Sequence, residues 1–421
     1  MTGGSRIRQP ASWLGGRTSS MGPELVSGAA DNDPTNVGTA AVVGAQTGYQ
    51  LSWAALLTGP MLYVILDIAA QVGLRARSDL QALVLRRFGR RVAGLLLISV
   101  VSVNVVTIAA DLQAGAAGVG LLTGINPQWL VLPLGAALAC LLLIGQYRHV
   151  AGLLRWLIPG FLAFAAAAVL ARPHWPSLIE SSFVPTLSLH RAVLTGAVAL
   201  TGTTLTSYVF VWETVQRGIE EPARHVPRDG LARARAGAAA AAVFTAAILW
   251  SMLVASAATL GRHHEPARSA QDAARALRPL AGPLAGDVFA AGLVVSAVVA
   301  LPVLVASTAH VVGAHFDWQR GLSQPVGRAR RFYAVLVAPL VLAVAASLAG
   351  IPVLATLVSA SVLGGLASPV GIVLLLLVAR DRQVMRGMPV SRSLAAAGWA
   401  VAVVVGGLGL LLVLAAAVSV A

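Results

Sequence analysis

Apolar runs long enough to cross a bilayer recur along the whole chain and are separated by short polar segments. A helix needs about 20 apolar residues to cross the hydrocarbon core of a membrane. Of the 421 residues, 57% are hydrophobic and only 11% are charged. Backbone polar groups inside the bilayer must be bonded within the protein, so such runs fold as helices. The sequence therefore predicts an all-α polytopic membrane protein.

Eleven membrane spans are predicted, with boundaries good to about four residues. A short cytoplasmic tail, residues 1–20, precedes them, and residues 172–191 are expected to form an outer loop. The predicted spans cover about residues 22–45, 51–74, 92–122, 128–146, 150–171, 192–216, 236–260, 284–314, 332–349, 352–379 and 394–420.

The basic residues indicate how the chain lies in the membrane. All 30 are arginine, and with a cytoplasmic N-terminus and eleven crossings 24 of them fall in or beside inner segments. An excess of basic residues on the cytoplasmic side is the usual sign of orientation. We therefore predict a multi-pass protein of the cell inner (plasma) membrane with its N-terminus in the cytoplasm. Nucleic-acid binding is not expected, because the arginines form no basic domain.

One predicted span is interrupted by the polar run 31–36, Asp-Asn-Asp-Pro-Thr-Asn. A carboxylate inside the bilayer costs at least about 2.5 to 3.5 kcal/mol, so such groups are kept for a function. Pro34 lacks an N–H and clashes with the preceding turn, which breaks the helix and leaves carbonyl groups free. Carboxylates beside free carbonyls predict an oxygen-rich cation site within the membrane.

A second break is predicted in the sixth span, where small hydroxyl residues run from Gly202 to Tyr208. The first and sixth spans each open a set of five, a pattern typical of inverted-repeat transporters with the substrate held between the two breaks. We therefore expect a transport domain at 21–380, with repeats at about 21–171 and 192–380, and an additional eleventh helix at 394–421.

The candidate cation ligands lie at these two breaks. Asp33 and Asn36 are three residues apart and, with the carbonyls near Asp31, can supply several oxygens to one ion. Asp33 can instead cap the second half-helix or pair with an arginine. The hydroxyls from Thr203 to Ser207 suit hard cations such as Mg²⁺ and Mn²⁺. They can instead bond back to their own helix.

Four further carboxylates lie in predicted spans. We expect Asp31 to face water in a vestibule, Asp67 to line a wet cavity or to pair between helices, and Asp111 to be either a proton relay or one half of a structural pair. Glu213 lies close to Arg217 at an inner helix end and is a further relay candidate.

Several classes of protein are disfavoured. The sequence holds no HExxH, CxxC, P-loop or nucleophile-elbow motif, which argues against a hydrolase or an ATP-driven pump, and we predict no enzymatic activity. The single Cys140 permits no disulfide within the chain. We expect no resident cofactor and no obligatory protein partner, but a lipid bilayer as surroundings and a divalent ion as transported substrate.

Three motifs together resemble the Nramp family of divalent-metal transporters. The sequence Asp-Pro-Thr-Asn at 33–36 and Gly-Ala-Gln-Thr-Gly-Tyr at 44–49 are similar to that family's first helix. The run 202–208 followed by Phe-Val-Trp-Glu at 210–213, and Leu-Pro-Val-Leu at 301–304, look closer to the Nramp-related magnesium transporter branch. The resemblance, from about residue 22 to 380, implies an eleven-helix LeuT-like fold with 5+5 inverted repeats and discontinuous helices 1 and 6.

The resemblance also implies a ligand set. Asp33 and Asn36 match metal ligands of the family, Thr203 falls where a backbone carbonyl reaches the ion, and Thr206 replaces a methionine. Because a hydroxyl does not favour soft transition metals as a thioether does, Mg²⁺ becomes an acceptable substrate.

Proton coupling is not expected. Asp111 matches an aspartate of the proton-coupled members, but Ala114 stands where they have glutamate, and the histidines after their sixth-helix motif are absent. We therefore expect uptake of Mg²⁺ and Mn²⁺ by alternating access without protons. The alternatives are an H⁺- or Na⁺-coupled symporter of an organic solute such as an amino acid, in which Asp33 binds the amine or the ion, and a transport-inactive metal sensor.

Overall fold

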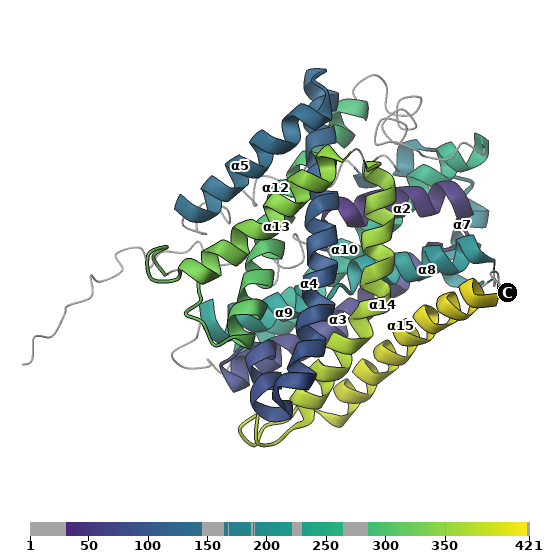
Figure 1. Cartoon of the computed structure of the whole chain (residues 1–421). Coiled ribbons are helices and arrows are strands. Elements are labelled where there is room, and N and C mark those ends of the chain that lie inside the picture. Colours follow the sequence, from purple (N-terminus) through teal and green to yellow (C-terminus); the bar gives the residue numbers. More distant parts are fainter. Residues whose placement is uncertain are drawn as a thin grey trace, which may run out of the picture.

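The computed structural model describes residues 31–144, 164–166, 168–186, 188, 190–220, 230–263, 285–322, 324–349 and 351–418, and the regular elements in these residues are all helical (Figure 1). They are α2 (Pro34–Thr47), α3 (Ser52–Ala76), α4 (Leu80–Thr123), α5 (Pro127–Ile144), α7 (Trp175–Phe183), α8 (Arg191–Thr204), α9 (Ser207–Val215), the π-helix η1 (Gln216–Glu220), α10 (Gly230–His263), α12 (Ala285–His315), α13 (Arg330–Leu348), α14 (Val353–Arg380) and α15 (Arg392–Val418).

Among the described residues, eight helices are long and apolar enough to cross a membrane, with α8, α9 and η1 counted as one span. The protein is therefore a multi-pass membrane protein. In Figure 1, α4 runs through the middle of the bundle and α15 lies along its outer edge. Side chains of α15 such as Val403 and Leu410 are exposed, as expected for a helix that faces lipid.

Both expected breaks are present. The residues Asn32 and Asp33 are not helical, and α2 begins at Pro34, where a missing N–H costs nothing because the first helical N–H groups have no intrahelical partner. In the sixth span, α8 ends at Thr204 and α9 begins at Ser207. The second break therefore lies between two described half-helices, and the first lies directly before α2.

The first half of the sixth span packs tightly on α14. A Cβ atom built on Gly202 would lie 2.1 Å from the carbonyl oxygen of Ser361 and 2.2 Å from the backbone nitrogen of Gly365. Only glycine permits this approach of two backbones. Thr39 of α2 reaches the same part of α14, with its hydroxyl 2.7 Å from that of Ser361. The two broken spans therefore share α14 as a neighbour.

Two helices begin before the predicted membrane spans that they contain. The third span was expected from about residue 92, but α4 begins at Leu80 and kinks at Gly89, whose φ is 81°. Residues 80–91 are basic, so their low hydropathy predicts a polar loop. They are helical in the structure, and Asp79 caps the start of this helix by accepting a hydrogen bond from the Ala82 N–H. Likewise α10 begins at Gly230 rather than at about 236.

The predicted outer loop, residues 172–191, holds the short helix α7. Other predictions concern segments outside the described residues. The cytoplasmic tail 1–20, the first half of the span 22–45 and most of the span 150–171 lie outside the described part of the chain, so their structure stays a prediction.

Candidate functional site

Asp33 joins the two broken helices. Its Oδ1 atom accepts a hydrogen bond from the Asn36 backbone N–H at 2.6 Å, so it caps α2, as one of the two readings of the sequence expected. Its Oδ2 atom accepts from the phenol of Tyr208, in the first turn of α9, at 3.1 Å. Residues 175 positions apart in the chain therefore meet at one carboxylate. Both residues are buried, so this contact lies inside the protein.

Asn36 closes the first break from the other side. Its Nδ2 atom donates to the Asp31 carbonyl oxygen at 2.8 Å, which satisfies a carbonyl that the break would otherwise leave free. The amide oxygen Oδ1 is thereby left without a hydrogen-bond partner among the described residues. An acceptor in this state suits a cation, because an unpaired buried polar atom is costly.

Asp111 of α4 reaches the same break. Its Oδ1 atom accepts from the backbone N–H of Thr35 at 3.0 Å and from the Thr35 hydroxyl at 2.6 Å. Asp111 is completely buried, and its Oδ2 atom has no partner in the described part of the chain. Asp111 therefore has one of its two expected roles, that of a structural partner, because it joins α4 to the first turn of α2.

At the second break, the Thr206 hydroxyl bonds back to its own chain. It donates to the carbonyl oxygens of Gly202 at 2.6 Å and Thr203 at 2.8 Å. Bonding of these hydroxyls to their own helix was the second of the two interpretations of the sequence. The Thr203 carbonyl keeps a second lone pair for another donor or ion. The Thr203 and Ser207 hydroxyl oxygens are buried and have no partner in the described residues.

The buried acceptors around the two breaks are all oxygens. Beside the two breaks, the oxygen atoms without a hydrogen-bond partner in the described residues include those of the Asn36, Asp111, Thr203 and Ser207 side chains. Carboxylate, amide and hydroxyl oxygens are ligands for hard cations. No group of three or more His, Cys, Asp or Glu residues in the described chain forms a closed metal site. The arrangement is therefore a buried set of oxygen acceptors that includes the carboxylates of Asp31, Asp33 and Asp111.

No arginine of the described chain pairs with the carboxylates at the first break. The ion pairs that are present involve other groups: Asp67 with Arg235 at 3.3 Å and Glu213 with Arg217 at 3.1 Å. Asp67 therefore pairs between α3 and α10, one of its expected roles. Glu213 is fully buried beside Arg217, one turn further along.

Asp31 was expected to face water in a vestibule. In this structure the residue is fully buried. The neighbouring Asn32 donates from Nδ2 to the Thr245 hydroxyl of α10 at 3.2 Å. Asp31 therefore does not face water in this structure, contrary to the expectation.

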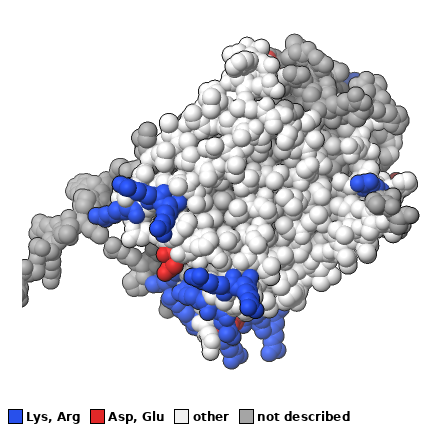
Figure 2. Space-filling model, viewed as in Figure 1, with Lys and Arg blue, Asp and Glu red and all other residues white. Residues whose placement is uncertain are grey.

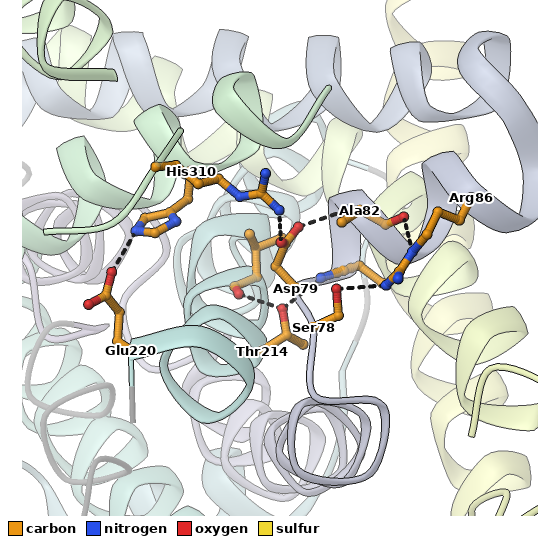
Figure 3. Close-up of polar contacts among 10 residues, drawn as sticks. Ser78, Asp79, Ala82, Arg86, Thr214, Glu220 and His310 are labelled. Atoms are coloured by element: carbon orange, nitrogen blue, oxygen red, sulfur yellow. Dashed lines mark hydrogen bonds and ion pairs between the residues drawn. The ribbon is translucent and has the colours of Figure 1, made fainter. Parts of the chain in front are cut away.

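Two features were missed from the sequence. Tyr208 was noted only as part of a motif, and the polar cluster at the other end of α9 was not expected. In that cluster, His310 Nε2 lies 3.1 Å from Glu220 Oε1 (Figure 3), and Asp79 Oδ2 accepts from Arg320 at 2.9 Å. The only available signal was the polar character of His310 inside an apolar span.

The sequence is similar to one protein family over most of its length. Residues 24–415 match the model of the family described as natural resistance-associated macrophage protein-like (Nramp). The divalent metal cation transporter MntH of Deinococcus radiodurans is 27% identical over 394 residues. The match covers 91% of this chain and 87% of the relative. The MntH of Aeromonas hydrophila is 25% identical over 288 residues, 66% of this chain and 69% of its own.

Solved structures show the fold. A manganese transporter of Eremococcus coleocola superposes with a TM-score of 0.76 at 17% identity, covering 93% of this chain and 85% of that chain. Mhp1, a nucleobase-cation-symport-1 family transporter, has a TM-score of 0.59 at 15% identity, covering 95% and 92%. The expected all-α, LeuT-like fold is confirmed by these likenesses together with the two broken spans.

Proposed function

The chain belongs to the Nramp family, and from that premise we propose that it is a secondary carrier that takes up Mg²⁺ and Mn²⁺ by alternating access, without proton coupling. The transport of divalent metal cations agrees with the names of its MntH relatives. It acts as a carrier rather than an enzyme and works without an obligatory protein partner. The membrane would be the plasma membrane, with the N-terminus in the cytoplasm.

The observation that carries this proposal is the meeting of the two broken spans at Asp33. The Asp33 carboxylate touches both helices, through the Asn36 N–H and the Tyr208 phenol. In the proposed ligand set, Asp33 and Asn36 supply side-chain oxygens, Thr203 its carbonyl, and Thr206 its hydroxyl or a retained water. Movement of α9 against α2 would change this ligand set, which is the differential binding that alternating access requires.

The choice of Mg²⁺ and Mn²⁺ rests on the type of donor. Every proposed ligand is an oxygen, and Thr206 offers a hydroxyl where a thioether would favour softer metals. Mg²⁺ keeps several of its waters when it binds and needs few direct carboxylate ligands. The proposed ligand set contains one carboxylate, that of Asp33, which fits that requirement.

The absence of proton coupling is proposed from the residues around the site. Asp111 is engaged by two hydrogen bonds from Thr35. Ala114, one turn further along α4, has no group that can accept a proton. The aromatic Tyr208 contacts Asp33 without the basic nitrogen that a histidine would offer. We propose that Asp31 becomes water-accessible only when the site opens.

Transport into liposomes tests the proposal. Protein is reconstituted in vesicles that hold a Mg²⁺-sensitive dye, and Asp33→Ala is compared with the parent and with Glu180→Ala, which removes an exposed carboxylate from α7. We expect the parent and Glu180→Ala to admit Mg²⁺ and Mn²⁺ and Asp33→Ala to be at least about tenfold slower, since even outer partners of metal ligands are worth this much.

Two outcomes would contradict the proposal. A parent that admits neither ion, or an Asp33→Ala variant as fast as the parent, would remove the metal-carrier function. A pH dye inside the same vesicles reports on coupling: acidification that rises in step with metal entry would show that protons are carried.

A further inference from the structure

A basic pocket lies where α12 meets α13, away from the proposed cation site. It is a cavity of about 370 Å³ that opens to solvent. Arginines crowd this part of the surface, which Figure 2 shows as a blue cluster at the left of the molecule. The side chains that line the cavity are those of Asp317, Trp318, Gln319, Arg328, Arg330 and Arg331.

The three arginines of this pocket are exposed and unpaired. Within the described residues, Arg328, Arg330 and Arg331 form no ion pair, whereas nearby Arg320 pairs with Asp79. Among the described residues that line the cavity, Asp317 is the only carboxylate, so these residues carry an excess of two positive charges. Three forked guanidinium groups around one cavity form a site for a phosphate, which they can bind through paired hydrogen bonds.

The aromatic residues place the pocket at the membrane surface. The Arg331 guanidinium lies 5.7 Å from the centroid of the Trp318 ring, and Trp318 stacks on Phe316 with ring centroids 5.2 Å apart. The membrane-spanning helix α13 begins at Arg330. Aromatic rings and arginines at the end of a span are typical of the headgroup region. The pocket therefore opens at the depth of lipid phosphates.

The backbone around the pocket is held in place by the rest of the protein. The Tyr333 phenol donates to the Gln324 carbonyl oxygen at 2.8 Å, and the Leu322 N–H donates to Glu220 Oε1 at 3.1 Å. Arg320 ties the same connection to α4 through Asp79. The arginines are thus presented from a fixed segment rather than from a loose tail.

We propose that this pocket binds the phosphate headgroup of an anionic phospholipid of the inner leaflet. The excess of positive charge selects an anionic over a zwitterionic lipid. Free phosphate shares this chemistry, but a lipid is concentrated at the surface where the pocket opens, and its acyl chains can lie along exposed apolar side chains of α13 such as Val341 and Leu342. Basic pockets between membrane helices on the cytoplasmic side bind lipids in this manner.

The test measures lipid binding by the full-length protein in detergent, by native mass spectrometry and by thermal unfolding. Dioleoyl phosphatidylglycerol is compared with dioleoyl phosphatidylcholine and with inorganic phosphate. The variant Arg328→Gln/Arg330→Gln/Arg331→Gln is compared with Arg91→Gln/Arg382→Gln/Arg392→Gln, which removes three exposed arginines that do not line the pocket. Each arginine near a charged surface is worth about fivefold in affinity, so the pocket variant should lose roughly a hundredfold.

The expected result is that phosphatidylglycerol binds to and stabilises the parent and the control variant, but not the pocket variant. Equal binding by the pocket and control variants would overturn the proposal. So would equal binding of phosphatidylcholine by the parent. Stabilisation by inorganic phosphate equal to that by phosphatidylglycerol would show a site for free anions and overturn the assignment to lipid. Because the measurement needs no transport, its result is independent of the proposed metal uptake.

Discussion

The close contact of α8 with α14 predicts that Gly202→Ala disables the protein. The added Cβ would lie 2.1 Å from the Ser361 oxygen and 2.2 Å from the Gly365 nitrogen, whereas ordinary contacts begin at 3.4 Å. The two helices would have to separate by about 1 Å. Overpacking of a core typically costs about 1 to 3 kcal/mol. We expect the upper end of this range, because the opposing atoms are backbone and cannot move as a flexible side chain can.

The same displacement should impair transport. Thr203, the next residue, is a proposed ligand through its carbonyl, and a shift of about 1 Å is enough to spoil an arrangement of groups around a bound substrate. We therefore expect Gly202→Ala to unfold several degrees below the parent in detergent and to lose metal uptake in liposomes.

Gly407→Ala is the matched control. Gly407 lies in α15 and has no atom within 4 Å of the position a Cβ would take, so alanine there should be neutral or stabilising by up to about 1 kcal/mol. If Gly202→Ala unfolds at the same temperature as Gly407→Ala, the close packing of α8 on α14 is wrong. If Gly202→Ala is as stable as the parent but has lost metal uptake, the substitution acts on the cation site and not through the packing of α8 on α14.

Two further predictions concern the arginine-rich end of the bundle. Asp79→Ala should lower the free energy of unfolding by about 3 to 5 kcal/mol, because it leaves Arg320 without its buried partner. Asp79→Asn keeps the helix cap and should lower it by about 1 kcal/mol less. Equal unfolding temperatures for the two variants would contradict a capping role. The hydrogen bond from Arg87 holds the pKa of Asp381 below its usual value, so the pair stabilises the protein above the ordinary pKa of about 3.8 and loses this effect as the pH falls through the lowered pKa. Arg87→Gln should therefore be less stable than the parent at pH 7, by at most about 1 kcal/mol because Arg87 is half exposed, and the difference should shrink towards pH 3; a difference that grows with acid would refute the pairing.

The membrane spans were predictable because hydropathy is a property of local sequence. The span 128–146 agrees within two residues with α5, Pro127–Ile144, and the span 332–349 with α13. The prediction failed at the start of α4, where the helix continues into a basic segment beyond the apolar run. Hydropathy reports where lipid begins, and a helix does not have to end there.

The breaks were predictable for a similar reason, but their contacts were not. Pro34 lacks a backbone N–H and follows Asp33, a good N-cap residue, so the local sequence favours a helix that begins there. The contacts of Asp33 with Tyr208 and of Asp111 with Thr35 join residues 175 and 76 positions apart. The candidate ligands Asp33, Asn36, Thr203 and Thr206 were named from the sequence, but their present hydrogen bonds were seen only in the structure.

The sequence by itself therefore determined that the chain is a helical membrane protein, where two of its spans break, and that oxygen atoms gather at those breaks. The tertiary structure alone decided which carboxylates are paired with arginine, Asp67 and Glu213, and which accept hydrogen bonds from the other broken span, as Asp33 does from Tyr208. The physical reason is that the helices are apolar on most faces, so the local pattern does not fix which face turns inward. Close packing at glycines such as Gly202 restricts that rotation, because a different face could not approach the neighbouring backbone so closely.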